Sequence, residues 1–394
     1  MNDALAPERE SEAVEAIRAA CLEGVKLDIV GGDTRRGLGR PREGGRQLSS
    51  AGLSGILFYA PAELTLSAKA GTTIETIEAA IAEHGQILPF EPMRPHALWN
   101  SGTKTTLGGM VATNLSGPRR LSAGAVRDGV LGLRIVNGLG QAIQCGGRVT
   151  KNVTGLDLTK LNCGAHGTLG FLTEATIKLA PKPETETTLV ISGLDNGRAI
   201  EAFTEALGSP FGVSGAAWAP ESHGRDVSQI FLRVEGFADS VDYRDGRLRS
   251  LLDRFGQIHA LTGDESAALW RSVRDAGFIA EPRDRAVWRI SLAPSAAPPF
   301  ISRLGETALA HFFDWGGALI WVATASSHDA AAAVRSAVAA TGGHATLLRA
   351  PDALRAAVAV FEPPSALAKR ISQGLKSSFD PGGVLNFGRM YEGV

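Results

Sequence analysis

The spacing of apolar residues divides the first part of the chain into short predicted elements. Residues 10–23 carry apolar side chains at Val14, Ile17 and Cys21, a spacing typical of a helix with one buried face. A second helix is predicted from a capping box at Thr72–Glu75 to His84, followed by Gly85 as its C-cap. Short apolar runs predict strands over residues 25–30, 56–59, 64–70, 128–137, 141–145 and 171–179.

The pattern changes near residue 184, after Pro181-Lys182-Pro183. Strand-like runs at 188–191, 229–234, 287–292 and 318–323 then alternate with helix-like runs at 198–207, 243–255 and 330–340, the last preceded by Asp329 as a predicted N-cap. A final helix is predicted over 364–377. We therefore expect an α+β protein with a first domain at 1–183, a second at 184–345, and a C-terminal helix and tail, 346–394, that return to the first domain.

Composition excludes several classes of function. A formal charge of −1 gives no electrostatic reason to expect nucleic acid or an anionic membrane as a ligand. No apolar run is long enough for a transmembrane helix, and the first residues do not resemble a secretory signal. Cys21, Cys145 and Cys163 are scattered, so we expect a reducing compartment and no iron–sulfur cluster held by this chain alone.

The 47 glycines gather in clusters, three of which lie beside predicted strands or helices: 31–39, 105–120 and 164–170. A strand that leads into a glycine loop can present backbone N–H groups to phosphate, although each loop alone could be an ordinary turn. The Gly-x-Gly at 37–39 and at 138–140 lack the third glycine of a Rossmann fingerprint, and no Walker A motif occurs. The three loops together predict a long anionic ligand held by main chain.

The same motifs resemble a known family. GGDTRRGLG at 31–39, LGGMVATNLSGPRR at 107–120, RDGVLGLRIVNGLG at 127–140, the run from Val149 to Pro181, and FDPGGVLNFGRM at 379–390 are similar in order and spacing to FAD-binding proteins of the vanillyl-alcohol-oxidase (PCMH) type. Within that family, LPFEP at 88–92, SGPRR at 116–120 and GGHATLLRAP at 342–351 resemble the smaller FAD-binding subunits of glycolate dehydrogenase (glycolate oxidase) complexes.

The resemblance implies a PCMH-type FAD-binding domain followed by a cap domain, and it assigns cofactor contacts. The implied FAD-binding residues are Gly31, Gly32, Asp33, Thr34, Arg35, Arg36, Thr106, Gly108, Gly109, Ala112, Ser116, Gly117, Gly164, Ala165, His166, Gly167, Thr168, Gly170, Ile177 and Asn386. Arg35 and Arg36 depart from the small residues usual in the first loop and could pair with phosphate or be solvated surface charges. The first two loops contain no His or Cys, so we expect noncovalent FAD.

Catalytic residues are harder to assign. Hydroxy-acid dehydrogenases of this family carry a motif close to His-x-Gly-Asp-Gly-Asn-x-His, because the substrate hydroxyl must lose a proton to a base. The motif is absent, and His223, His259, His311, His328 and His344 are isolated in the sequence. His344 is the best single candidate for a catalytic role, although a histidine bonded in a turn explains it as well. We expect Lys151 and Asp157 to be structural, and the tryptophans to be core or interface residues.

The resemblance thus implies an FAD-binding subunit that helps to oxidise glycolate to glyoxylate and passes electrons to an iron–sulfur subunit, alongside a larger flavin subunit. Such a chain would be cytoplasmic, or held at the inner face of the membrane by its partners. Two alternatives stay open: a noncatalytic scaffold of that complex, and a stand-alone FAD enzyme acting on another hydroxy acid or alcohol.

Overall fold

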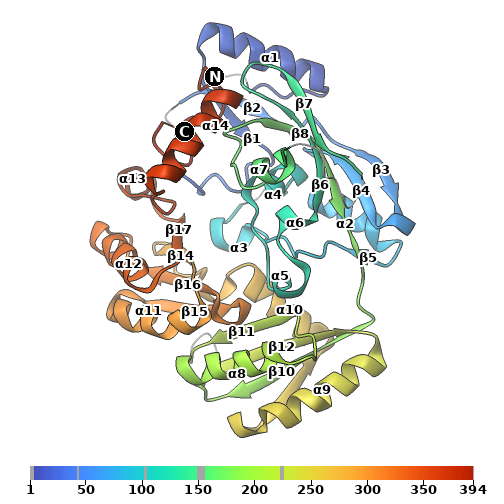
Figure 1. Ribbon diagram of the computed structural model, residues 1–394, viewed down its shortest axis with the longest axis vertical. Coiled ribbons are helices and arrows are strands. Elements are labelled where there is room, and N and C mark those ends of the chain that lie inside the picture. Colours follow the sequence, from blue (N-terminus) through green and yellow to red (C-terminus); the bar gives the residue numbers. More distant parts are fainter. Residues whose placement is uncertain (1–3, 42–43, 102–103, 149–155, 222–225, 394) are drawn as a thin grey trace. The chain divides into compact units, whose positions relative to one another are not determined.

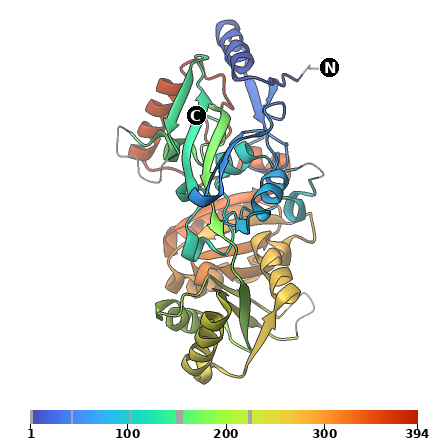
Figure 2. The ribbon, with the colours of Figure 1, turned by 90° about the vertical axis from the view of Figure 1, so that its right-hand side faces the viewer.

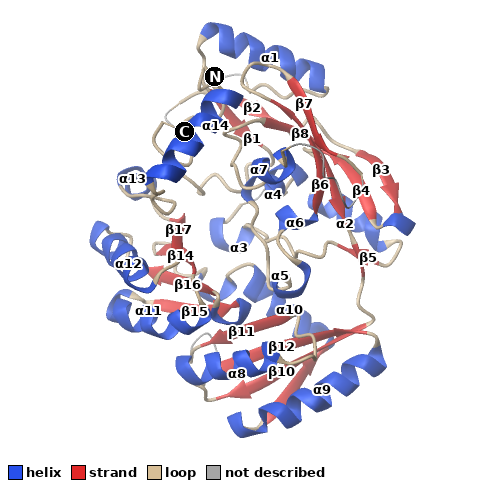
Figure 3. Ribbon diagram, in the orientation of Figure 1, coloured by secondary structure: helices blue, strands red, loops and turns tan. Residues whose placement is uncertain are grey.

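The computed structural model describes residues 4–41, 44–101, 104–148, 156–221 and 226–393 (Figure 1). The chain forms two compact units. The first comprises 1–115, 124–182 and 363–394, and the second comprises 116–123 and 183–362. Both units mix helices with antiparallel sheet, as the colouring in Figure 3 makes visible, and the predicted α+β class is confirmed.

The first unit contains a five-stranded sheet of order β3-β4-β8-β6-β7 and two small sheets, β1-β2 and β5-β9. Its elements are α1 (Glu10–Glu23), β1 (Leu27–Val30), β2 (Arg46–Ser49), β3 (Ile56–Ala60), β4 (Thr65–Lys69), α2 (Ile74–Ala82), β5 (Gln86–Ile87), α3 (His96–Trp99), α4 (Leu107–Thr113), α6 (Val126–Gly129), β6 (Val130–Val136), β7 (Ala142–Gly146), α7 (Leu158–Asn162), β8 (Phe171–Lys178), β9 (Ala180–Pro181) and α14 (Ala366–Phe379).

Three local predictions in the first unit need correction. The N-cap of α2 is Thr73, whose Oγ1 accepts from Thr76 N, because the Thr72 hydroxyl is already bonded to Gly55. The strand predicted from residue 128 begins at Val130, since Asp128 accepts from Ala125 N and closes a helical turn. Helix α1 has the predicted bounds, but its fully buried residues are Ala13, Ile17 and Ala20, whereas Val14 and Cys21 are half-buried.

The second unit is built on an eight-stranded antiparallel sheet of order β13-β10-β12-β11-β15-β16-β14-β17. Its elements are α5 (Arg120–Ala123), β10 (Thr185–Ser192), α8 (Asn196–Gly208), β11 (Gly215–Ala219), β12 (Gln229–Gly236), α9 (Ala238–Leu252), β13 (Ile258–Thr262), α10 (Gly263–Arg274), β14 (Ala286–Ser291), α11 (Ala297–Leu304), β15 (Ala310–Asp314), β16 (Leu319–Thr324), α12 (His328–Thr341), β17 (His344–Arg349) and α13 (Asp352–Ala357). The N-cap of α12 is Ser327, not Asp329, because the Ser327 hydroxyl reaches Ala330 N.

One face of the large sheet forms the core of the second unit. Side chains from alternate strand positions, such as Leu232, Trp288 and Val322, pack there against α8, α9, α11 and α12. These helices cover the same face of the sheet in the view of Figure 2. The alternate positions therefore point to the opposite face, as the two-residue period of a strand requires.

The C-terminal segment belongs to the first unit. The turn after α14 lies along β1, where Leu27 N donates to Val384 O at 2.7 Å and Lys26 Nζ donates to Gly383 O at 2.7 Å. A buried ion pair, Lys376 to Asp380, fixes this turn, and Asp380 also accepts from the backbone N–H groups of Val384 and Leu385. The last residues of the chain are therefore held against its first strand.

Candidate functional site

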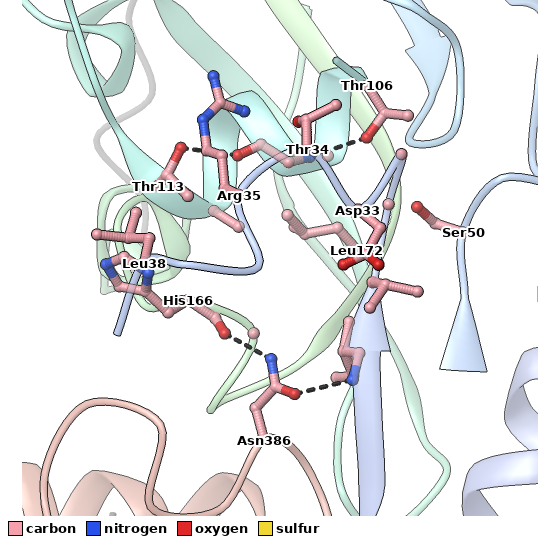
Figure 4. A pocket seen from close by; sticks show the side chains of 18 of the residues that line it. Asp33, Thr34, Arg35, Leu38, Ser50, Thr106, Thr113, His166, Leu172 and Asn386 are labelled. Carbon is pink, nitrogen blue, oxygen red and sulfur yellow. Dashed lines mark hydrogen bonds between the residues drawn. The ribbon is translucent and has the colours of Figure 1, made fainter. Parts of the chain in front are cut away.

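The first glycine loop leaves the buried strand β1 and packs closely against the segment that leads into α4. A side chain at Gly31 would clash with Thr106 Oγ1, and one at Gly32 would clash with the carbonyl oxygen of Lys104. The glycines are therefore needed for the approach of two protein segments, and the loop can turn at Asp33 with φ near 52°. Figure 4 shows Asp33, Thr34 and Thr106 side by side around a pocket.

Helix α4 begins in the second loop. Its N-cap, Thr106, has an extended backbone and accepts from Gly109 N at 3.2 Å, as N-cap threonines do. Thr113 Oγ1, at the other end of the helix, donates to Gly109 O at 2.8 Å. Gly108 lies against Ala70, where a Cβ would be about 3.0 Å from the Ala70 side chain. The sequence that looked like a bare loop is thus a short capped helix.

The third loop joins α7 to β8 and is held by backbone bonds to the end of α4. Gly164 N donates to Val111 O at 3.1 Å and His166 N donates to Ala112 O at 3.0 Å. His166 and Gly167 both have left-handed φ angles, 52° and 73°. The His166 side chain lies beside the pocket in Figure 4, and burial together with the guanidinium groups of Arg389 and Arg35 lowers its pKa to about 3. His166 is therefore neutral at physiological pH.

The C-terminal turn completes the pocket. Asn386 accepts from Ile29 N at 2.8 Å and donates to His166 O at 2.7 Å, so one side chain links β1 to the third loop (Figure 4). Arg389 donates to the carbonyls of Arg40 at 2.9 Å and Arg36 at 3.1 Å, which ties the first loop to the same turn. Four segments that are distant in sequence thus meet around one space.

The pocket has an empty volume of about 740 Å³, a figure that includes space open to solvent. Its described lining consists of Ile29, Val30, Gly31, Gly32, Asp33, Thr34, Arg35, Arg36, Leu38, Ser50, Thr106, Gly108, Gly109, Ala112, Thr113, His166, Gly167, Gly170, Phe171, Leu172, Asn386 and Arg389. Arginines outnumber carboxylates in this lining, so the pocket is suited to an anion.

The two arginines of the first loop differ. Arg35 is only 8% exposed and donates to Met93 O at 2.9 Å, so it is not a solvated surface charge. Arg36 is exposed and pairs with Asp33. The pocket is thus surrounded by glycines, the capped start of a helix and buried guanidinium groups. These features suit the pyrophosphate of a dinucleotide such as FAD.

Some residues that the sequence predicted for this site lie elsewhere. Gly164, Ala165 and Thr168 shape the third loop without lining the pocket, and Ile177 is buried in β8 within the core. Ser116 and Gly117 fall in the second unit, where Gly117 O accepts from Trp315 Nε1 at 3.1 Å. Their contact with a flavin stays a prediction.

Several lining residues were missed. Ile29, Val30, Phe171 and Leu172 flank the first and third loops, so the junction of strand and loop was a usable signal. Arg389 lies three residues after Asn386 and its charge was visible in the same motif. Leu38, Ser50 and Thr113 carried no pattern that marks them.

The histidines considered for catalysis do not form a group. His259 and His328 are exposed at separate elements, His311 is packed against Trp218 and Phe313, and burial lowers its pKa to about 4. His344 is exposed at the start of β17. His223 and Lys151 lie outside the described residues, while Asp157 caps α7 through Lys160 N at 2.9 Å. Among the residues described, no set of three His, Cys, Asp or Glu side chains is placed to hold a metal ion.

Comparison with known proteins points to FAD as the cofactor. Residues 4–146 match the family model described as FAD binding domain. The chain is 37% identical over 380 residues to glycolate oxidase subunit GlcE of Escherichia coli (strain K12), covering 96% of each protein. It is 35% identical over 198 residues to glycolate oxidase subunit GlcD of Bacillus subtilis (strain 168), covering 48% of this chain and 39% of that protein.

The fold also matches a solved structure. 4-Ethylphenol oxidase from Gulosibacter chungangensis, in a complex with isoeugenol, has a TM-score of 0.73 and covers 98% of this chain and 89% of its own, at 14% identity. That likeness concerns the fold alone. No helix in the described ranges is both long and apolar enough to cross a membrane. By its sequence and its fold, the chain belongs to the PCMH-type FAD-binding family, in the group that contains glycolate oxidase subunit GlcE.

Proposed function

We propose that the chain is the FAD-binding subunit of a glycolate dehydrogenase (glycolate oxidase) complex, which oxidises glycolate to glyoxylate. The observation that carries this proposal is the 37% identity to glycolate oxidase subunit GlcE over 96% of both chains. The similarity to that subunit extends through the second unit as well as the FAD-binding region. It therefore supports the same role for the two proteins, and not only a common FAD-binding domain. The pocket of the first unit would hold the cofactor.

The loops of that pocket would hold FAD through main chain and a few side chains. The Gly31–Arg36 loop and the start of α4 at Thr106–Gly109 would flank the pyrophosphate, and Arg35 and Arg389 would offset its charge. Gly167 and Asn386 would fix the third loop against it. Bound FAD supplies a hydride acceptor. The first two loops contain no cysteine or histidine, which supports noncovalent attachment.

The other parts of the proposal are the partners. We place the substrate base on a larger flavin subunit, because the histidines described in this chain lie far apart in its elements. Electrons would leave through an iron–sulfur subunit, and association with the membrane would occur through these partners. The same dispersed histidines support a second candidate, a scaffold subunit whose FAD does not react with substrate.

The colour and activity of the purified chain distinguish these functions. The chain alone should be yellow and inert to glycolate, and glycolate-dependent reduction of a dye should require its co-expressed partner subunits. Bleaching of the isolated chain by glycolate would instead support an autonomous enzyme. A colourless chain that still restores activity to its partners would support the scaffold.

A graded series at Gly109 tests the cofactor site itself. A Cβ there would lie 3.3 Å from Thr106 Oγ1 and 3.8 Å from Arg35 Nη1, so Gly109→Ala should keep most of the FAD. Gly109→Trp should fill the pocket and remove FAD while the chain stays folded by circular dichroism. Full FAD occupancy in the tryptophan variant would contradict the placement of the second loop.

A further inference from the structure

The face of the large sheet opposite the core carries a row of polar and aromatic side chains. In β14, Trp288 and Ile290 face the core, so Arg289 and Ser291 point to the other side. Arg289 lies directly across from Trp321 of β16 and from Thr346 of β17. All of these residues belong to the second unit.

In the described structure, the side chains of Trp321 and Arg289 in this row are donors without an acceptor. Trp321 is 2% exposed, and its buried Nε1 has no hydrogen-bond partner among the residues that the structure describes. Within the described part of the chain, Arg289 forms no hydrogen bond or ion pair, and its guanidinium lies 4.8 Å from the ring centre of Trp315. Buried donors are almost always satisfied in folded proteins. Arg289 is half-buried, so the buried Trp321 Nε1–H is the donor that indicates an acceptor from outside the chain, and Arg289 lies across from it.

The surroundings favour an anionic acceptor. The guanidinium of Arg120 lies over the same Trp315 ring, at 4.6 Å. The carboxylate of Asp314 raises the pKa of Arg289 through its charge. Asp314 is 1% exposed, however, and it already accepts a hydrogen bond from Trp315 N at 2.7 Å. Burial and Arg120 lower the pKa of Arg289 to about 10, against the opposing effect of Asp314. Arg289 is half-buried and Arg120 is exposed, so one negative ligand at the Trp315 ring would meet two positive charges.

The segment bearing Arg120 is fixed to this unit. Trp315 Nε1 donates to Gly117 O, and Arg119 forms a two-pronged ion pair with Glu235, at 2.7 and 2.8 Å. Trp315 itself lies in the β15–β16 turn, where it and the two following glycines adopt left-handed φ angles. Arg120 and Trp315 are therefore held in place beside Arg289 before any ligand arrives.

We propose that Arg289 and the Trp321 Nε1–H group bind the carboxylate of a small organic acid on this sheet face. Trp315 forms one wall, and Arg120 adds a second positive charge. A guanidinium and one indole N–H together match the two oxygens of a carboxylate. The inference rests on the proposed function for the identity of the acid, a two-carbon hydroxy or oxo acid.

Calorimetric titration of the purified full chain with oxalate, which is not oxidised as glycolate is, tests the site directly. Arg289→Gln and Trp321→Phe should each weaken oxalate binding at least tenfold, whereas Arg247→Gln, at an arginine that also lies over an aromatic ring, should not change it. Arg289→Lys keeps the charge and should still bind more weakly than the parent chain. Equal affinity in all the variants would overturn the proposal.

The stability of the tryptophan variants gives a second readout. Trp321→Phe loses buried ring volume, but the donor that it removes has no partner in the described chain, so it should lower the melting temperature without oxalate less than the loss of a bonded indole does. Trp270→Phe is the matched control, because Trp270 Nε1 donates to Thr188 Oγ1 at 2.7 Å. It should lower the melting temperature and leave oxalate affinity intact. A loss of stability in Trp321→Phe as large as that in Trp270→Phe would mean that its N–H is satisfied within the chain.

Phosphate distinguishes a carboxylate site from a general anion site. Inorganic phosphate at the same ionic strength should compete with oxalate weakly, and equal competition would overturn the assignment of a carboxylate. The two proposals also fail separately. A chain that supports glycolate oxidation with its partners but binds no oxalate refutes this site alone, and one that binds oxalate through Arg289 but supports no glycolate oxidation refutes the proposed function alone.

Discussion

Asn386 and His166 are 220 positions apart in sequence, yet the Asn386 side chain donates to the His166 carbonyl at 2.7 Å. The same amide accepts from Ile29 N, so three segments of the first unit share one residue. A ligand in this pocket meets loops that are fixed to one another rather than loops that must be ordered on binding. The entropy of ordering them is lost when the chain folds, which leaves more binding energy for the ligand.

The bond between Asn386 and His166 can be removed with little change in shape. Asn386→Asp keeps the oxygen that accepts from Ile29 N and loses the donor to His166 O, leaving two oxygens facing each other. We expect FAD affinity to fall about tenfold or more, a cost of about 1–3 kcal/mol for an unsatisfied group. Asn100→Asp is the control, because Asn100 is exposed and also has a left-handed backbone. Fluorescence titration of the apoprotein with FAD measures both, and equal affinities would show that the amide bond does not order the pocket.

Gly32 is required by the packing of the first two segments. Gly32→Ala should displace the loop from Lys104, reduce FAD content and lower the melting temperature, because the clash is with backbone and not with a movable side chain. Gly246→Ala has open space around it within α9 and should stabilise the chain by about 0.5–1 kcal/mol through helix propensity. Thermal unfolding and flavin absorbance measure both effects. A Gly32→Ala chain with normal FAD content would mean that the loop has room to shift.

Arg389 should act on FAD through the first loop as well as through its charge. Arg389→Met removes the bonds to the carbonyls of Arg36 and Arg40, and charged hydrogen bonds contribute about 1.5–3 kcal/mol each. We expect FAD to dissociate at least tenfold more readily. Arg370→Met, on the exposed side of α14, should have no effect. Dissociation can be followed by the rise in flavin fluorescence, and identical rates in the two variants would exclude this role.

The ion pair between Glu10 and Arg134 should make stability depend on pH. Hydrogen bonds from Arg134, at 3.0 Å, and from Thr173, at 2.7 Å, lower the pKa of Glu10 below its ordinary value of 4.5. The charged form is favoured in the folded chain, so this contribution is complete above pH 4.5 and is lost as pH falls through the lowered pKa.

Glu10→Gln should therefore cost about 1 kcal/mol at pH 7, because the pair is partly exposed. The difference from the parent chain should shrink below pH 4.5. Urea unfolding at several pH values measures it, with the exposed Glu15→Gln on the same helix as the control. A difference that stays constant down to pH 3 would mean that the folded state does not shift the titration of Glu10.

Much of this protein follows from sequence alone. The bounds of α1, the α+β class and the three glycine loops follow from local patterns, because apolar periodicity and glycine act over a few residues. The loops that line the pocket were identified largely by those patterns. Local patterns were less reliable for helix caps: the N-cap of α12 is Ser327, not the predicted Asp329. Backbone geometry at the helix start decides which hydroxyl or carboxylate reaches the free N–H groups.

The tertiary structure decided which distant segments of the chain are in contact. Sequence could not reveal that Gly31 and Gly32 are needed for contact with Thr106 and Lys104, that Arg389 holds the first loop, or that Gly117 bonds to Trp315. Nor could it place Arg289 across from Trp321, because strand pairing joins residues that no local pattern connects. Which donors are left without acceptors depends on every neighbour at once, and only the folded chain determines that.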